Sequence, residues 1–296
     1  MPETTQQLLS PEFIAKLEQL ELVSRKIFVG RMKGERKSKR RGQSVEFMDY
    51  RSYVVGDDLR FLDWNIYGRL DKLFIKLFLE EEDLHFYLLI DSSVSMDFGD
   101  PTKLFYAKQI AASLAFIGLI NHDRVVIETF NDRLDARIGP IRGRTQFWRV
   151  MDFLTKLEPT GASHMADSAK SFAIKNTGKG VLVVLSDFLD KAGYEEALRY
   201  FVARNMDIYA IHIMSQEEVE PELAGDLRLV DAEDSDVADI TVSAPLLKRY
   251  KQNLNAFCGG LKEWCTRRSI TYVFTTNQRP FDQLVLTYLR QRGLIK

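Results

Sequence analysis

The chain has 296 residues, and its 41 Lys plus Arg are balanced by 42 Asp plus Glu, which gives a formal net charge of −1. This balance argues against a whole-molecule polyelectrolyte that binds nucleic acid or membranes, and the 45% hydrophobic content predicts a globular protein with a sizeable core. Two cysteines, Cys258 and Cys265, lie about two helical turns apart. That is too far for a disulfide, so we expect reduced thiols and a cytoplasmic protein.

The first 83 residues form an N-terminal segment that we expect to be helical and extended. Residues 11–32 have helical spacing, and residues 1–7 lack the pattern of a secretory signal. Seven basic residues and one acid lie between Arg31 and Arg41, which predicts an exposed loop. A solvated loop, a docking patch for an acidic partner and a nucleic-acid contact are the alternatives. Because the overall charge is balanced and no aromatic residues interleave the basic ones, no nucleic-acid partner is expected.

Charged and aromatic residues alternate between Glu46 and Trp64, in the series Glu46-Phe47-x-Asp49-Tyr50-Arg51-x-Tyr53-x-x-Gly56-Asp57-Asp58-x-Arg60-x-x-Asp63-Trp64. Half-buried carboxylates need partners, and arginine, which binds with two donors, is the one we expect. We therefore predict an ion-paired clamp that fixes this segment to the following domain. Residues 73–79 are predicted to form a strand.

The most informative stretch is 86–98. Its first five residues are apolar or aromatic, which predicts a strand buried on both faces of a parallel sheet, and Asp91 follows directly. Ser93 and Ser95 come at alternate positions, so one carboxylate and two hydroxyls can share the space beyond the strand, where open α/β sheets bind ligands. Oxygen ligands without imidazole or thiolate suit Mg²⁺ or Mn²⁺. Turn hydrogen bonds made by the same residues are the alternative.

The spacing Asp91-x-Ser93-x-Ser95 resembles the first loop of the metal-ion-dependent adhesion site of von Willebrand factor A domains. Together with the series from Glu46 to Trp64, it resembles the bacterial and archaeal family called domain of unknown function 58. The resemblance implies a von Willebrand factor A-like domain that associates with MoxR-type AAA+ ATPases. It implies no particular reaction.

Helices and strands alternate through the remainder of the chain. We predict strands at 124–130, 134–138, 180–185, 208–213 and 270–275, and helices at 101–120, 143–157, 165–176, 194–205, 245–268 and 281–291. The longest apolar run, 110–120, is too short to span a membrane and predicts a buried helix. Residues 84–296 are therefore expected to form a doubly wound α/β domain, with a mostly parallel sheet and helices on both faces.

Two later loops complete the predicted site. The strand at 180–185 ends in Ser186-Asp187, a second buried strand followed by an aspartate. The loop 158–164 contains Gly161-Ala162-Ser163, and in the resembled adhesion site this loop supplies a hydroxyl; Ser163 is the matched ligand and Thr160 is the rival. The usual motif continues Asp-Gly, whereas Phe188 follows here, a departure that concerns loop shape more than ligand chemistry.

Five acids lie between residues 231 and 239, without the glycine and terminal glutamate of an EF-hand. We predict the tip of a hairpin in a small β insertion.

The resemblance implies that Asp91, Ser93, Ser95, Ser163 and Asp187 hold one Mg²⁺ or Mn²⁺ that binds a partner's carboxylate. We therefore expect a non-enzymatic adaptor that binds a MoxR-type ATPase, a client protein or both. The alternative is a phosphate-transferring hydrolase with Asp91 as nucleophile, but such enzymes use a second Asp where Ser93 stands. Neither a Gly-x-Ser-x-Gly elbow nor a phosphate-binding loop occurs in the sequence.

Overall fold

The computed structural model describes residues 8–20, 46–79, 85–223, 225–230, 237–291 and 293–295. The chain divides into two compact units, one of Met1–Ser24 with Leu84–Lys296 and one of Arg25–Asp83. The basic run 31–41 lies outside the described residues.

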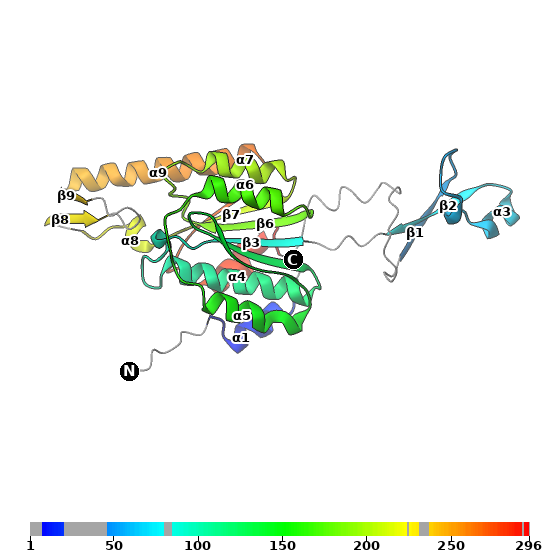
Figure 1. The fold of residues 1–296 in the computed structure, drawn as a ribbon, viewed down its shortest axis with the longest axis horizontal. Coiled ribbons are helices and arrows are strands. Elements are labelled where there is room, and N and C mark those ends of the chain that lie inside the picture. The colour runs from blue at the N-terminus through cyan, green and yellow to red at the C-terminus, as the bar shows by residue number, and fades with distance from the viewer. Residues whose placement is uncertain are drawn as a thin grey trace. The chain divides into compact units, whose positions relative to one another are not determined.

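The larger unit is built on a six-stranded sheet of order β10-β7-β6-β3-β4-β5 (Figure 1). Its strands are β3 (His85–Asp91), β4 (Arg124–Phe130), β5 (Leu134–Ile141), β6 (Gly180–Ser186), β7 (Asp207–Met214) and β10 (Thr271–Thr276). All neighbours pair in parallel except β4 and β5, which are antiparallel. The two most apolar strands, β3 and β6, lie side by side in the middle, so both of their faces can be covered.

Helices cover both faces of this sheet. The helices of this unit are α1 (Pro11–Leu17), α4 (Lys103–Ile120), α5 (Phe147–Thr155), α6 (Met165–Lys175), α7 (Glu195–Ala203), α8 (Gln216–Val219), α9 (Ala244–Arg267) and α10 (Phe281–Gln283), with the short 3₁₀ turns η2 (Val94–Met96) and η3 (Arg144–Gln146) and the π-helix η4 (Leu284–Leu289). Phe86 and Leu88 pack with α4 and α5 in one core, and Tyr87 and Leu89 pack with α6 and α7 in the other. Alternate side chains of one strand thus enter two cores. The predicted doubly wound, mostly parallel α/β fold is confirmed.

The central pair of strands requires a glycine where β6 begins. Gly180 is paired with His85, and a Cβ atom at Gly180 would lie 1.8 Å from the backbone oxygen of His85. The close approach of the two strands therefore excludes any side chain at this position.

Helix α4 lies in the middle of one helical layer (Figure 1). Among the described helices, it alone is long and apolar enough to cross a membrane, but 78% of that stretch is buried inside the protein. The prediction that residues 110–120 form a buried helix is confirmed.

The predicted segment 1–83 is divided in the structure. Helix α1 belongs to the larger unit, where Phe13 packs edge-on against Phe281 with ring centroids 4.9 Å apart. Gln109 Nε2 on α4 donates to the backbone oxygen of Leu8 at 3.1 Å. Phe13 and Leu17 lie on one stripe of α1 and are buried, which explains why this helix joins the core.

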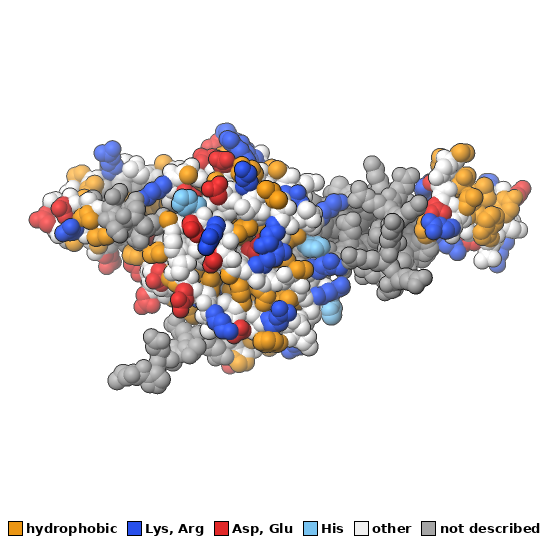
Figure 2. All heavy atoms as spheres, viewed as in Figure 1, with side chains coloured by type: hydrophobic (Ala, Val, Ile, Leu, Met, Phe, Trp, Pro, Cys, Tyr) orange, Lys and Arg blue, Asp and Glu red, His pale blue; other side chains and the backbone are white. Residues whose placement is uncertain are grey.

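The smaller unit contains an antiparallel pair, β1 (Glu46–Ser52) and β2 (Phe74–Leu79), with η1 (Leu59–Phe61) and α3 (Trp64–Leu70) between them. The predicted pairing of its charges is found within the unit: Arg51 donates two hydrogen bonds to Asp57, and Lys76 forms an ion pair with Asp63 at 3.0 Å. These contacts lie within the smaller unit, and the clamp to the following domain stays a prediction. Large apolar side chains at its surface (Figure 2) are Tyr50, Val54, Val55, Leu59, Phe61, Trp64, Tyr67, Leu70 and Leu73.

A second small sheet, β8 (Gly225–Val230) paired antiparallel with β9 (Val237–Val242), lies in sequence between α8 and α9. This is the predicted β insertion. Residues 231–236, which contain four of the five acids of this run, lie outside the described residues.

Candidate functional site

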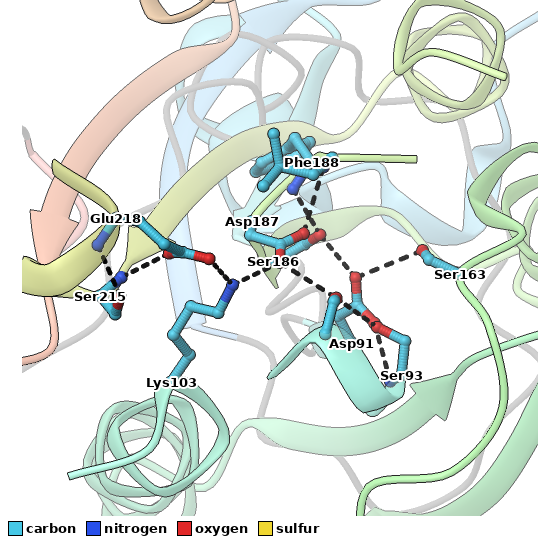
Figure 3. A network of polar contacts seen from close by, with 11 residues as sticks. Asp91, Ser93, Lys103, Ser163, Ser186, Asp187, Phe188, Ser215 and Glu218 are labelled. Carbon is cyan, nitrogen blue, oxygen red and sulfur yellow. Dashed lines mark hydrogen bonds and ion pairs between the residues drawn. The ribbon is translucent and has the colours of Figure 1, made fainter. Parts of the chain in front are cut away.

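Asp91 is the last residue of β3 and is fully buried at the carboxyl end of the sheet (Figure 3). Its Oδ1 accepts hydrogen bonds from the backbone nitrogen of Ser93 at 3.0 Å and from Ser93 Oγ at 2.6 Å. Its Oδ2 accepts a 2.7 Å hydrogen bond from Ser186 Oγ. The strand therefore presents a carboxylate whose two oxygens are oriented by the hydroxyl groups of Ser93, in the loop after β3, and of Ser186, at the end of β6.

The alternating serines after β3 extend from Asp91 to Asp187. Ser93 Oγ lies 3.0 Å from Ser95 Oγ, and Ser95 Oγ donates to Asp187 Oδ2 at 3.1 Å. Since β3 and β6 are neighbours in parallel, the residues that follow them meet at one edge of the sheet. The structure thus connects Asp91, Ser93, Ser95 and Asp187 in one polar cluster.

The third loop contributes Ser163, whose Oγ lies 3.5 Å from Asp91 Oδ2. Gly161 in this loop adopts φ +69°, a left-handed conformation that favours glycine, and its oxygen accepts from the backbone nitrogen of Val94 at 3.0 Å. Thr160 Oγ1 accepts a hydrogen bond from Asn131 Nδ2 at 2.9 Å. Of the two hydroxyls that the sequence left open, the one that reaches the cluster is Ser163.

The residue after Asp187 shapes the second loop. Phe188 adopts φ 55° although it is not glycine, and its side chain is fully buried against the ring of His212. Its backbone nitrogen donates to Ser186 Oγ at 2.9 Å, while that of Leu189 donates to Asp187 Oδ1 at 3.1 Å. Phe188 therefore affects the loop conformation, as predicted, and leaves the Asp187 carboxylate in the cluster.

The two carboxylates repel one another in a buried site. Burial raises the pKa of Asp91 to about 7, the nearby charge of Asp187 adds to the rise, and the hydrogen bonds from Ser93 and Ser186 oppose it. In the part of the chain that the structure describes, Asp91 has no ion-pair partner. A cation beside Asp91 would allow both carboxylates to stay ionised.

Lys103, which was not among the predicted site residues, forms an ion pair with this cluster. It begins α4, its side chain is 1% exposed, and its Nζ lies 2.7 Å from Asp187 Oδ2 and 2.8 Å from Glu218 Oε1. Burial lowers the pKa of Lys103, but the charges and hydrogen bonds of Asp187 and Glu218 outweigh it and leave the pKa above its ordinary value. The ammonium is therefore charged.

Glu218 is held in turn by the end of β7. The backbone nitrogen of Ser215 donates to Glu218 Oε2 at 2.7 Å, and the backbone nitrogen of Glu218 donates to Ser215 Oγ at 3.0 Å, forming a capping box at the start of α8. The spacing Ser-x-x-Glu was the sequence signal for it. Ser186, next to the predicted Asp187, is the other missed member of the cluster.

The donor chemistry of the cluster fits a hard divalent cation. The predicted residues supply two carboxylates and three hydroxyls from three loops, all oxygen donors, as Mg²⁺ and Mn²⁺ prefer. The described residues include no group of three or more His, Cys, Asp or Glu arranged to hold a metal, so a zinc site with imidazole and thiolate ligands has no counterpart there. Asp91, Ser93, Ser95, Ser163 and Asp187 are the residues that would hold the ion, and the ion would supply positive charge for an anionic ligand.

Sequence comparison identifies the family to which the chain belongs. The family model described as "Protein of unknown function DUF58" matches residues 49–257. Similar curated proteins are the uncharacterized protein Rv1480 of Mycobacterium tuberculosis and the uncharacterized protein Mb1516 of Mycobacterium bovis. Each is 26% identical over 241 residues, which cover 80% of this chain and 76% of the relative.

Solved structures similar to this one include a conserved hypothetical protein, BatB, from Bacteroides thetaiotaomicron, with 13% identity and a TM-score of 0.46. It covers 70% of this chain and 98% of its own. The SpRpn10 VWA domain is 17% identical with a TM-score of 0.38 and covers 69% of this chain and 94% of its own.

Proposed function

Because the chain belongs to the DUF58 family, we propose that it is a non-enzymatic interaction module that binds an acidic side chain of a partner protein through a divalent cation. The resemblance of the loops at Asp91, Ser163 and Asp187 to the adhesion site of von Willebrand factor A domains supports an interaction role in general. The cation, Mg²⁺ or Mn²⁺, is held by Asp91, Ser93, Ser95, Ser163 and Asp187.

The observation that carries this proposal is the convergence of oxygen-bearing side chains from three separate loops on Asp91. Ser93 and Ser163 approach its two oxygens at 2.6 and 3.5 Å, and Ser95 links it to Asp187. A turn that only satisfies its own backbone needs no second buried carboxylate from the next strand. Lys103 compensates the charge of Asp187, but Asp91 has no ion-pair partner among the described residues. A buried carboxylate without a cation is costly, which supports a role for the pair as ligands.

The chemistry of the partner follows from the charge of the ion. A divalent cation bound by two carboxylates and neutral hydroxyls keeps positive field at an open position, and a carboxylate is the side chain that best satisfies it. From the family resemblance, we propose a MoxR-type AAA+ ATPase, a client protein or both as partners. The cytoplasmic location stays a prediction.

The environment of Asp91 gives no support to the alternative of a phosphate-transferring hydrolase. Ser93 lies at the position of the second aspartate of such enzymes and donates to Asp91. Its hydroxyl cannot act as the acid or base at neutral pH that the reaction needs.

The test is a pull-down of the purified ATPase by the full chain in Mg²⁺ and in excess EDTA. We expect capture in Mg²⁺ that is lost in EDTA and in Asp91→Ala. Thr160→Ala is the matched control, since Thr160 lies in the same loop as Ser163 but binds Asn131. Equal capture in EDTA would remove the metal from the interaction.

A further inference from the structure

The buried ion pair of Lys103 is unusual for the place it occupies. Lys103 is the first residue of α4, where the helix dipole is positive and disfavours a cation. Its side chain is also buried, which is costly for an ammonium without anionic partners. Helix formation and core packing therefore both disfavour lysine here, and the two carboxylates that it contacts are what stabilise it.

One of these carboxylates belongs to the candidate metal site. Lys103 Nζ contacts Asp187 Oδ2 (Figure 3). The same oxygen accepts a hydrogen bond from Ser95 Oγ. The other oxygen, Oδ1, accepts from the backbone nitrogen of Leu189. The ammonium thus lies on the oxygen of Asp187 that faces the serines of the first loop, where it shares a ligand with any bound cation.

The second carboxylate, Glu218, lies on the opposite side of the ammonium from the site. Its Oε1 lies 2.8 Å from Lys103 Nζ, its Oε2 is fixed by Ser215, and its backbone oxygen accepts a 2.7 Å hydrogen bond from Tyr250 of α9. Glu218 is therefore held independently of Lys103. Glu218 neutralises part of the positive charge of Lys103, which Asp187 would otherwise neutralise alone.

We infer that Lys103 is a resident cation that competes with the divalent ion for Asp187, and that Glu218 sets the strength of this competition. This inference rests on the proposed function and adds a regulation of that site. Lys103 and Glu218 act through Asp187 and are positioning residues. Because Lys103 competes for Asp187, the protein alone binds the divalent ion more weakly. The partner's carboxylate then contributes more of the total binding free energy of the ion, so the ion and the partner bind together.

The inference predicts opposite effects for two neutralising substitutions. Lys103→Met removes the competing charge and keeps the length of the side chain, so Mn²⁺ is expected to bind roughly tenfold or more tightly. Glu218→Gln removes one of the two carboxylates that contact the ammonium, so Lys103 competes more strongly for Asp187. Mn²⁺ is therefore expected to bind about threefold to tenfold more weakly. A purely structural ion pair would change metal affinity in the same direction in both variants, or in neither.

The experiment is a titration of the full chain with Mn²⁺, in which electron paramagnetic resonance measures the concentration of the free ion. Thermal unfolding of every variant in EDTA shows whether it folds. Tighter binding in Lys103→Met together with weaker binding in Glu218→Gln supports the inference, as does binding detectable in Lys103→Met alone. Unchanged or weaker binding in Lys103→Met overturns it while leaving the proposed function intact. If Lys103→Met does not fold, Glu218→Gln decides, because unchanged or tighter binding there contradicts the competition. Absence of binding in all folded forms overturns both proposals.

Discussion

Ser186 Oγ donates a 2.7 Å hydrogen bond to Asp91 Oδ2 and accepts one of 2.9 Å from the backbone nitrogen of Phe188. Ser186 is the last residue of β6, and Asp91 ends the neighbouring strand β3. This one hydroxyl therefore joins the two strand ends on which the proposed site is built. Its position determines both the orientation of Asp91 and the turn that carries Asp187.

We predict that Ser186→Ala weakens Mn²⁺ binding about tenfold and lowers the free energy of unfolding by about 1 to 2 kcal/mol, because a buried carboxylate loses a donor. Isothermal titration calorimetry and urea unfolding measure the two effects. Ser168→Ala is the matched control: this serine is equally buried, and its Oγ has no hydrogen-bond partner among the described residues. Loss of affinity in both variants would contradict a specific role for Ser186.

Phe188 allows a test of the loop conformation, because its φ of 55° is disfavoured for residues with a Cβ atom. Truncation of this buried ring leaves a cavity, so both Phe188→Ala and Phe188→Gly are expected to lower the free energy of unfolding by about 2 to 4 kcal/mol. Glycine is expected to be more stable than alanine here by about 1 kcal/mol, the reverse of their usual order. Chemical denaturation measures both variants, and an alanine variant more stable than the glycine one would contradict the backbone assignment.

His212 gives a prediction for the pH dependence of stability. It is fully buried among aromatic rings, with Nδ1 2.8 Å from the hydroxyl of Tyr272, and burial lowers its pKa to about 4. In the unfolded chain the histidine has an ordinary pKa of about 6.5. Between pH 6.5 and 4 the unfolded chain therefore binds a proton at this residue, whereas the folded chain does not. The contribution of His212 to stability is therefore lost as the pH falls through this window, by roughly 2 kcal/mol between pH 7 and pH 4.5.

Urea unfolding at pH 7 and at pH 4.5 measures this loss. In His212→Leu the same pH change is expected to cost about 2 kcal/mol less than in the wild type, even though the variant is less stable at pH 7 because Tyr272 loses a partner. An equal pH dependence in the two proteins would show that other groups cause it.

Glu128 provides a test of the packing around β4. Its side chain is 1% exposed and contacts Arg137 at 2.8 Å, Lys175 at 2.8 Å and Asn176 at 2.9 Å. We predict that Glu128→Ala lowers the free energy of unfolding by about 3 kcal/mol, since the buried amide of Asn176 and the partly buried guanidinium of Arg137 lose this carboxylate. Lys156→Ala breaks an exposed pair with Asp152 and is expected to cost less than about 0.5 kcal/mol. Similar losses in thermal or urea unfolding of the two variants would contradict this assignment.

The sequence predicted most of the sheet because its central strands are continuous apolar runs. Residues 86–90 and 180–185 could only be buried on both faces, and once they are parallel neighbours, Asp91 and Asp187 must lie at the same edge. The site was predictable because neighbouring parallel strands place the residues that follow them at the same edge of the sheet. This prediction needed no knowledge of the helices.

Other features depended on contacts that have no local pattern. Lys103 and Glu218 are separated by 115 positions, and their contact requires α4 and α8 to meet at the sheet edge. The preference for Ser163 over Thr160 depends on the loop conformation at Gly161 and on the bond from Asn131. Strand β5 continues to Ile141, beyond the predicted end at 138, because Ile141 still pairs with Val125 across an irregular register.

Helix α1 also depends on contacts that its own sequence does not show. It precedes the smaller unit in the chain but belongs to the larger one. The apolar stripe of α1 predicted a helix with a buried face, but the surface that buries it lies on α4 and near Phe281, far along the chain. Periodicity identifies a face to be covered and does not identify what covers it.

The most direct test of the account is the stoichiometry of Mn²⁺ binding to the full chain, measured by calorimetry with Asp91→Ala, Asp187→Ala and Thr160→Ala beside the wild type. We predict one ion per chain in the wild type and in Thr160→Ala, and a loss of affinity of at least a hundredfold in both aspartate variants. Equal binding in Asp91→Ala and the wild type, or no saturable binding in the wild type and in Lys103→Met, would contradict a cation site at the ends of β3 and β6.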